Sequence, residues 1–263
     1  MSRPILSVVT VVRNGIDFID DTLRSVSSQT YLEREHIIID GGSTDGTLDV
    51  IARYAAHLAH VVSEPDRGIA DAFNKGIRAA HGDYVLFLNA DDYLAGPDVL
   101  GAVAQAITAA ASPTLVYGDC QVVERTTRRQ MYDVRPQFSR RRFLWGFSLP
   151  HPSLFFHRRY FEQYGMYDLS FKLAMDLELL ARGVLRESLL YVPVVVSVMR
   201  HGGVSTQDRG LAVSETVRAL TKNRLISPML GGFRLRSYYR VRAVVRAGLD
   251  ALGMYERVSR VRT

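Results

Sequence analysis

The stretch Leu86 to Leu94, LFLNADDYL, places an apolar run directly before two adjacent acids. Such a run predicts a buried strand, and open α/β folds bind ligands where their strands end. Asp91 and Asp92 therefore mark a candidate ligand site at the rim of a sheet. A carboxylate acting together with substrate phosphates is a common way to hold Mg²⁺ or Mn²⁺. The alternative, that both acids only begin a turn or cap a helix, stays open at this point.

Two further transitions from strand to helix lie upstream. Ile5 to Val12 is apolar throughout, apart from two hydroxyl residues, and precedes a helical pattern over Ile16 to Val26. His36 to Asp40 is a second strand candidate, and the sequence GGSTDG follows it at 41–46. Glycines let the backbone approach a ligand closely, and the N–H groups at a helix start bind anionic oxygen. Together these transitions predict a nucleotide-binding crevice.

Six segments of the chain carry a resemblance to a known family. They are SVVTVVRN (7–14), IIIDGGSTDGT (37–47), DRGIADAFNKGIRAAHGDYVLFLNADD (66–92), HPSLFFHRRYF (151–161), FKLAMDLELLARG (171–183) and HGGVS (201–205). In this order and spacing they resemble the family 2 glycosyltransferases of the GT-A type. The resemblance covers roughly Ile5 to Ser205. It implies an α/β fold with a Rossmann-like, mostly parallel central sheet flanked by helices, which also agrees with the alternation of strand and helix patterns.

The resemblance implies that the first half of the chain binds a nucleotide diphosphate sugar, with UDP- and GDP-sugars as the expected donors. The family places its first strand end against the base and ribose, an acid of the second strand against the base, and a loop and helix start over the ribose and diphosphate. The matching positions are Thr10, Val12, Arg13 and Asn14, then Asp40, then Asp66, Gly68, Asp71 and Asn74. Ordinary helix capping is the alternative for Asp66 and Asp71. Gly41 departs from the family, because many relatives carry a second acid there, and this leaves the identity of the base open.

The residues Asn89, Ala90 and Asp91 match the family's Asp-x-Asp motif, whose last carboxylate binds the metal that bridges the donor phosphates. The resemblance therefore implies Mn²⁺ or Mg²⁺ as the cofactor, with Asp91 as a direct ligand. Asn89 departs from the motif: its amide can bond to the ribose or to a metal-bound water, but it lacks the negative charge. His201 matches a histidine that the family places near the metal and diphosphate, and a purely structural role is its alternative.

Asp176, in LAMDLEL, matches the family's catalytic aspartate. A carboxylate near the acceptor hydroxyl suits the role of general base, which accepts the proton as the hydroxyl attacks the anomeric carbon. Glu178 lies two residues further and need not share this role, because helical residues at this spacing point in different directions. The implied function is a metal-dependent, inverting transfer of a sugar to a hydroxyl of a saccharide or a lipid-linked acceptor. A catalytically silent nucleotide-binding or scaffolding subunit of a glycan assembly system is the alternative.

Three aromatic residues precede or begin the fourth of these segments: Trp145, Phe147 and His151. Flat rings stack on sugars, so these residues are candidates for lining an acceptor pocket. Simple core packing is the alternative for each of them.

The expected organisation is a glycosyltransferase domain over residues 1–227, with a nucleotide-sugar half (1–113) and an acceptor half (114–227), followed by a basic helical extension (228–263). In the extension, apolar residues recur at helical spacing, while Arg236 and Arg240 fall on the opposite face. These apolar residues are Tyr238, Val241, Val245, Leu249 and Leu252. Such a helix suits the anionic inner leaflet of a membrane. Packing on the domain or a homodimer contact is the alternative.

The 263 residues are 47% hydrophobic and carry a formal net charge of +6. No apolar run reaches the length of a membrane span: 189–199 is too short and contains Pro193, which fits a buried strand. The only cysteine, Cys120, excludes an intramolecular disulfide, and no secretion signal begins the chain. We therefore expect a cytoplasmic protein, either free or peripheral on the inner face of the cell membrane. The basic residues do not interleave with a recognisable nucleic-acid-binding module, so no nucleic-acid partner is expected.

Overall fold

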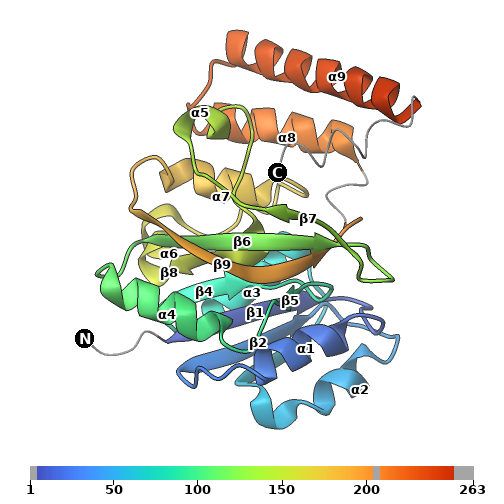
Figure 1. Cartoon of the computed structure of the whole chain (residues 1–263), viewed down its shortest axis with the longest axis vertical. Coiled ribbons are helices and arrows are strands. Elements are labelled where there is room, and N and C mark those ends of the chain that lie inside the picture. Colours follow the sequence, from blue (N-terminus) through green and yellow to red (C-terminus); the bar gives the residue numbers. More distant parts are fainter. Residues whose placement is uncertain (1–4, 204–207, 252–263) are drawn as a thin grey trace.

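The computed structural model of the chain describes residues 5–203 and 208–251. In this part of the chain the backbone forms a nine-stranded mixed sheet that is flanked by helices (Figure 1). The strands are β1 (Leu6–Val12), β2 (Arg34–Asp40), β3 (His60–Ser63), β4 (Tyr84–Phe87), β5 (Tyr93–Leu94), β6 (Leu115–Val123), β7 (Gln130–Val134), β8 (Leu154–His157) and β9 (Leu189–Arg200). The helices are α1 (Ile19–Ser27), α2 (Thr47–Ala52), α3 (Ile69–Ala79), α4 (Val99–Ala109), α5 (Arg140–Phe143), α6 (Arg158–Tyr164), α7 (Met175–Gly183), α8 (Arg209–Lys222) and α9 (Leu230–Ala251), with short 3₁₀ turns η1 (Ala55–His57) and η2 (His151–Ser153).

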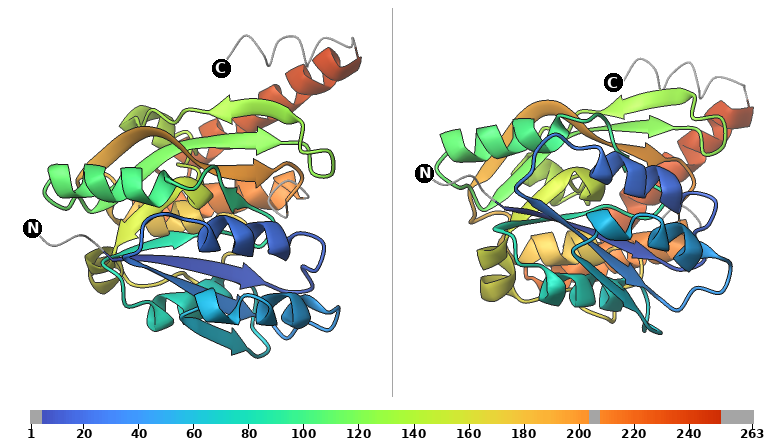
Figure 2. Two further views of the ribbon diagram at one scale, coloured as in Figure 1. Left: turned by 60° about the horizontal axis from the view of Figure 1, so that its bottom comes forward. Right: turned by 90° about the horizontal axis from the view of Figure 1, so that it is seen from below.

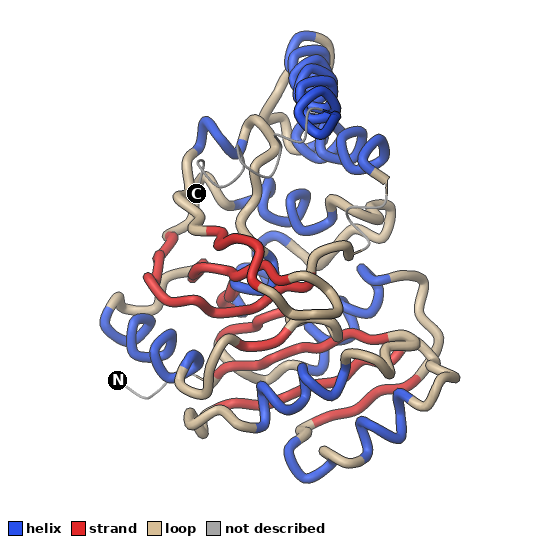
Figure 3. Tube along the Cα trace, turned by 45° about the vertical axis from the view of Figure 1, so that its right-hand side comes forward, coloured by secondary structure: helices blue, strands red, loops and turns tan. Residues whose placement is uncertain are grey.

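The strand order is β3-β2-β1-β4-β8-β6-β9-β5, and β7 pairs with β6. Figure 3 shows the strands side by side, with helices around them. The first four of these strands run parallel, which is the arrangement that the alternating strand and helix patterns predict. In the second half β6 and β9 are also parallel, but β8 runs antiparallel to both β4 and β6. The predicted α/β fold is confirmed, and its parallel character is concentrated in the first half.

Strand β1 shows how the sequence builds a two-sided core. All seven of its residues are buried, as expected for a central parallel strand rich in β-branched residues. Val9 and Val11 belong to the core cluster that includes α3, α6 and α7, whereas Leu6 and Val8 belong to the cluster that includes α1 and α4. Alternate residues of a strand point to opposite faces, so one apolar run supplies both cores. Figure 2 shows α1 and α3 on opposite sides of this strand.

The apolar stretch at 189–199, predicted as a buried strand, forms β9 and extends to Arg200. Within the described residues, no helix is both long and apolar enough to cross a membrane.

The predicted C-terminal helix is present as α9, which lies with α8 beyond the end of the sheet farthest from α1 and α2 (Figure 1). Leu235 of α9 is buried and joins the large core cluster, so the described part of the extension packs on the preceding domain. The predicted apolar face is divided, because Tyr238 packs its ring against Trp145, whereas Val241 is 64% exposed. Leu252 lies outside the described residues.

Candidate active site at the carboxyl ends of the strands

Asp40 ends β2 and organises the turn that follows it. Its side chain is fully buried and accepts hydrogen bonds from the backbone N–H groups of Gly42 and Ser43, at 3.1 and 3.0 Å. The hydroxyls of Ser43 and Ser63 also donate to it. Three of these bonds reach Oδ2 and one reaches Oδ1, so most of the carboxylate's acceptor positions are used within the protein. In this structure Asp40 therefore holds the turn, and these bonds leave one acceptor position on Oδ1 unused.

The end of β1 is joined to the same turn by Asn14, whose backbone has a φ of 51°. The N–H of Asn14 donates to the Ser43 hydroxyl at 2.7 Å, and its side-chain oxygen accepts from the N–H of Thr44 at 2.9 Å. Asparagine tolerates this left-handed backbone better than most residues. The buried Val12 accepts a backbone bond from the 41–43 turn, while Arg13 is exposed. Residues 12–14, which are predicted to bind the sugar donor, thus lie beside the end of β2, and the two segments together form a rim.

Thr10 lies deeper than the other residues that are predicted to bind the sugar donor. Its side chain is fully buried, and its hydroxyl lies 3.0 Å from Nε2 of His36 on β2. Burial lowers the pKa of His36 to about 3, so this imidazole is neutral. Thr10 therefore supports the rim from beneath and offers no side-chain surface to a ligand.

Asp66 approaches the rim from the loop before α3. A Cβ added to Gly41 would lie 2.3 Å from Oδ2 of Asp66 and 3.4 Å from Cβ of Arg13. Only glycine therefore fits at position 41 with Asp66 in this place. The other oxygen, Oδ1, accepts the N–H of Gly68 at 2.8 Å. The structure brings Arg13, Gly41 and Asp66 together, with Asp66 filling the space that a side chain at position 41 would take.

The remaining predicted residues of this loop bond within the protein. Asp71 is buried and pairs with Arg67, through the backbone N–H at 3.1 Å and the guanidinium at 3.2 Å. The side-chain hydrogen bond from Arg67 lowers the pKa of Asp71. Gly68, at the N-cap of α3, has a φ of 112°, which favours glycine. Asn74 bonds to both backbone groups of Tyr167, at 2.8 and 2.9 Å, and so fastens α3 to the second half of the chain.

The candidate metal motif forms a tight turn after β4. The hydroxyl of Thr22 on α1 donates to the carbonyl oxygens of Ala90 and Asp92, at 2.9 and 2.6 Å. The Asn89 amide donates to the carboxylate of Asp92 at 3.0 Å, and Asp92 is almost fully buried. Burial, followed by the nearby charge of Asp91, raises the pKa of Asp92. Asp92 is therefore an internal support of the turn, and Asp91 is the acid that remains partly exposed.

Two arginines from distant strands converge on this turn. Arg125, in the loop after β6, donates to the carboxylate of Asp91 at 2.8 Å and lies 4.3 Å above the ring of Phe18. Arg200, the last residue of β9, donates to the backbone oxygen of Asp91 at 2.6 Å and also pairs with Asp21. Its side chain is 1% exposed. These contacts neutralise the acids of the rim with charges that the motif itself does not contain.

The donor atoms at this turn fit a hard divalent cation. The side-chain oxygen of Asn89 is buried and has no hydrogen-bond partner in the described structure. The Asn89 side-chain oxygen and the Asp91 carboxylate are both oxygen ligands, the type that Mg²⁺ and Mn²⁺ prefer. Among the described residues, no group of three or more His, Cys, Asp or Glu side chains is placed to hold a metal ion. A cation here therefore needs oxygens from substrate or water to complete its coordination.

His201 follows Arg200 directly and is exposed at the same rim. Its backbone N–H donates to the carbonyl oxygen of Val123 at 2.9 Å. Among the residues that the structure describes, no contact joins the His201 side chain to Asp91. Val204 and Ser205, the end of the HGGVS motif, lie outside the described residues.

Asp176 lies in the first turn of α7 and has the properties of a base. Its carboxylate is half-buried, and burial raises its pKa from 3.8 to about 6. In the described part of the chain no side chain donates a hydrogen bond to it. Glu178 instead turns inward: its fully buried carboxylate bonds to Arg182 and Lys222. The two acids therefore have different environments, as the sequence predicts.

A cluster of aromatic rings links β4, which precedes the turn of Asn89 to Asp92, with the segment that leads to Asp176. His151 stacks on Phe87 of β4 with ring centroids 5.3 Å apart, and its Nε2 lies 2.7 Å from the hydroxyl of Tyr167. Burial lowers the pKa of His151 to about 4. Tyr167 in turn packs against Phe87, and the charge of Asp176 contributes to the raised pKa of its hydroxyl. His151 is thus partly buried and held by packing against Phe87 and by its contact with Tyr167.

Trp145, expected in an acceptor pocket, is instead covered by the C-terminal helix. The ring of Tyr238 lies 5.0 Å from it, and the guanidinium of Arg234 lies 4.3 Å above it. Phe147 lies beside Arg142, whose guanidinium is 5.2 Å from its ring. Packing therefore explains Trp145 in this structure, which is the alternative that the sequence left open.

Comparison with known sequences identifies the relatives of this chain. The sequence profile described as Glycosyl transferase family 2 matches residues 7–165. A Mycobacterium tuberculosis protein named as an uncharacterized glycosyltransferase is 35% identical over 197 residues, covering 74% of this chain and 73% of its own length. The PGL/p-HBAD biosynthesis glycosyltransferase of Mycobacterium bovis is 33% identical over 211 residues, covering 78% and 80%.

Solved structures share the fold at low sequence identity. Staphylococcus aureus TarS in complex with UDP-GlcNAc superposes with a TM-score of 0.69 at 18% identity, covering 86% of this chain and 69% of that one. The mannosyltransferase PcManGT of Pyrobaculum calidifontis, in complex with GDP-Man and Mn²⁺, gives a TM-score of 0.62 at 21% identity, covering 95% and 76%. The fold is therefore that of the GT-A glycosyltransferases. With the profile match and the relatives at 35% and 33% identity, the chain belongs to glycosyl transferase family 2 and is a glycosyltransferase.

Proposed function

We propose that the chain transfers a sugar from a nucleotide diphosphate sugar to a hydroxyl of a saccharide or lipid-linked acceptor, with inversion at the anomeric carbon. The observation that carries this proposal is Asp176. A half-buried carboxylate with a pKa of about 6, free of side-chain donors in the described structure, is suited to accept a proton near neutral pH.

The donor would lie along the rim formed by residues 12–14, the 41–43 turn and the loop before α3. Asp66 is the more exposed carboxylate there, since Asp40 is fully buried and accepts four hydrogen bonds within the protein. We therefore assign the contact with the base or ribose to Asp66 and a positioning role to Asp40. UDP and GDP are the nucleotides named for the solved structures of similar fold, and they define the first donors to test.

In the reaction, the acceptor oxygen attacks the anomeric carbon while its proton passes to the carboxylate of Asp176. The bond between that carbon and the phosphate oxygen breaks, and its electron pair leaves with the nucleoside diphosphate. One displacement inverts the configuration. A divalent cation, Mn²⁺ or Mg²⁺, would be held by Asp91 and Asn89 and would stabilise the charge of the departing diphosphate. His201, at the same rim, is proposed as a further contact of that group.

A bacterial surface glycan pathway is the proposed setting. Relatives named for PGL/p-HBAD biosynthesis and, over 93 residues, for teichuronic acid biosynthesis in Bacillus subtilis support this setting. The names do not specify the acceptor of this chain, so it remains a saccharide or a lipid-linked glycan.

The proposal is tested by binding and hydrolysis of a panel of UDP- and GDP-sugars with and without Mn²⁺. We compare the native chain with Asp91→Ala and Asp176→Asn. The expected result is metal-dependent binding of one donor, lost in Asp91→Ala and retained with slow turnover in Asp176→Asn. If a donor binds but the native chain turns over no faster than Asp176→Asn, the chain is the silent nucleotide-binding subunit. Absence of binding to every donor contradicts both functions.

A further inference from the structure

The start of α9 exposes large apolar side chains on the surface of the molecule. Met229, Leu230 and Phe233 are 83%, 80% and 74% exposed, and Val241 is 64% exposed. Leu230, Phe233 and Val241 share one face of the helix, because their spacings of three and eleven residues return to nearly the same direction. Isolated exposed apolar residues are ordinary, but a helical stripe that begins with three such neighbours marks an interaction surface.

The opposite face of α9 is already used. Leu235 is buried in the core, and the hydroxyl of Tyr239 donates to the carbonyl oxygen of Trp145 at 3.3 Å. These contacts fix the rotation of the helix about its axis. The apolar stripe is therefore held outward by packing and does not fold back onto the described domain.

The charges around the stripe have one sign. Between Glu215 and Asp250 the chain contains no acidic residue and eight basic ones: Arg218, Lys222, Arg224, Arg234, Arg236, Arg240, Arg242 and Arg246. Arg218 and Lys222 pair with acids of neighbouring elements. Among the described residues, Arg224, Arg234, Arg236 and Arg240 form no ion pair with a carboxylate. These arginines border the apolar stripe rather than share its face: Arg236 and Arg240 lie on the side of α9 away from Val241, and Arg234 lies over Trp145. We call Met229, Leu230, Phe233 and Val241 with these four bordering arginines the basic apolar surface.

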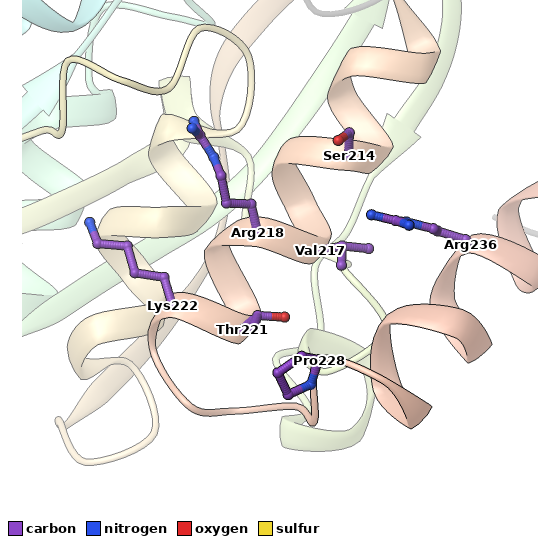
Figure 4. A pocket seen from close by; sticks show the side chains of 7 residues that line it. All are labelled: Ser214, Val217, Arg218, Thr221, Lys222, Pro228 and Arg236. Carbon is purple, nitrogen blue, oxygen red and sulfur yellow. The ribbon is translucent and has the colours of Figure 1, made fainter.

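A groove of about 480 Å³ lies beside this surface, between α8 and α9 (Figure 4). Figure 4 shows the Arg236 guanidinium extending from α9 toward Val217 of α8, while Arg218 and Lys222 point away from α9. The Thr221 hydroxyl borders the groove and is buried without a hydrogen-bond partner in the described structure. A guanidinium and a free hydroxyl suit an anionic oxygen.

We propose that the basic apolar surface docks the protein on an anionic lipid bilayer, with Met229, Leu230 and Phe233 entering the interface and the arginines contacting lipid phosphates. Apolar insertion combined with attraction to anionic lipids is how interfacial helices bind membranes. A second copy of the chain is a poorer occupant, because a two-fold contact would set the arginines against themselves with no acid to pair. This inference goes beyond the proposed reaction and does not depend on it.

The test is flotation of the full chain with vesicles, in the absence of donor and acceptor. We expect binding to vesicles of equal parts phosphatidylcholine and phosphatidylglycerol, weaker binding to phosphatidylcholine alone, and loss of binding as salt is raised. The triple variant Arg224→Gln, Arg236→Gln and Arg240→Gln is expected to weaken partition roughly fivefold for each arginine, on the order of 100-fold in total. The matched control changes three exposed arginines elsewhere: Arg53→Gln, Arg78→Gln and Arg186→Gln.

The apolar contribution is tested with Met229→Ser, Leu230→Ser and Phe233→Ser in one variant. Its matched control is Leu32→Ser, Leu48→Ser and Met131→Ser, which removes exposed apolar side chains from other elements. We expect loss of flotation only in the first variant, with circular dichroism and thermal unfolding unchanged in both. Equal binding by variant and control, or no binding by the native chain to anionic vesicles, overturns the proposal. Light scattering that shows a dimer dissociated by the first variant assigns the surface to a second copy instead.

Discussion

Arg125 and Asp91 form an ion pair of 2.8 Å that joins the loop after β6 to the turn after β4. The carboxylate of Asp91, which we propose as the metal ligand, is thus already neutralised by a positive charge of the protein. A divalent cation at Asp91 and this guanidinium would repel each other, since like charges at short range are unfavourable. The ion pair therefore sets the affinity of the site for metal in the absence of substrate.

Replacing Arg125 with alanine is expected to tighten Mn²⁺ binding to the nucleotide-free protein. The pair is partly exposed, and such pairs contribute about 1 kcal/mol, which corresponds to about a fivefold change in affinity. Titration with Mn²⁺, followed by the paramagnetic resonance of the free ion, measures the change. Arg129→Ala is the control, because Arg129 lies in the same loop without contacting Asp91. Weaker Mn²⁺ binding in Arg125→Ala would show that the guanidinium supports the site rather than competing for it.

Asp176→Asn is expected to lower turnover by roughly 10²- to 10⁴-fold, the range typical for loss of a general base, while donor affinity is retained. For the native chain, kcat should fall below pH about 6, because protonation of Asp176 removes its acceptor oxygen. Steady-state rates with a fixed sugar donor, measured over about two pH units on either side of neutrality, test both statements. A flat profile below pH 6 would exclude Asp176 as the base.

The same substitution is expected to stabilise the protein. The folded pKa of Asp176 is raised from 3.8 to about 6, so the ionised carboxylate costs folding free energy. This cost is absent below the unfolded pKa, grows through the folded pKa and is complete above it. Asp176→Asn should therefore raise the free energy of unfolding by about 1 to 2 kcal/mol at pH 8 and leave it unchanged at about pH 3. Urea unfolding at the two pH values measures this difference, and equal effects would contradict the assigned cause.

Glu178→Gln is expected to do the opposite. Burial alone would raise the pKa of Glu178, but hydrogen bonds from Arg182 and Lys222 lower it below its ordinary value of 4.5. Its stabilisation is therefore present above pH 4.5 and lost as the pH falls through the lower, folded pKa. Removing the charge leaves Arg182 without its buried partner, at a cost of about 3 kcal/mol. Thermal unfolding should show the loss, while turnover per folded molecule stays close to native.

Gly41→Ala is expected to weaken donor binding with little effect on stability. The new Cβ would lie 2.3 Å from Oδ2 of Asp66, and the carboxylate must move away from the rim. We expect a higher KM for donor with kcat nearly unchanged, measured beside Gly96→Ala, where no atom lies within 4 Å of the new Cβ. Unchanged KM would place the donor away from Asp66.

The first half of the fold follows closely from local patterns. Continuous β-branched runs such as Ile37 to Ile39 predict central strands, and β1 to β4 appear where these runs lie. The second half depends on pairing between distant segments: β8 lies between β4 and β6, an order that no local pattern encodes. The residues predicted for the site were found from motifs, and the structure joins the ends of β1 and β2 in one rim through Asn14 and Ser43.

The motifs do not predict which side chains and backbone groups contact each site residue. Arg125 lies in the sequence ERTTRR, where nothing distinguishes it from its neighbours, and only the pairing of β6 with β9 brings it to Asp91. Likewise, the motif identifies Asp40 but does not predict that it accepts hydrogen bonds from the turn that follows it and from Ser63. Hydrogen bonds over long sequence separation decide such roles, and a single sequence does not reveal them.

The hydrogen bonds between the Asn74 amide and both backbone groups of Tyr167 have a consequence for building hybrid enzymes. Asn74 belongs to the segment that we expect to recognise the donor, and Tyr167 to the segment that leads to the base. A chimaera that joins the first 113 residues of this chain to the second half of a relative inherits only one side of this contact. Exchange of acceptor specificity between relatives should therefore succeed only where the incoming loop presents its backbone to Asn74 in the same way.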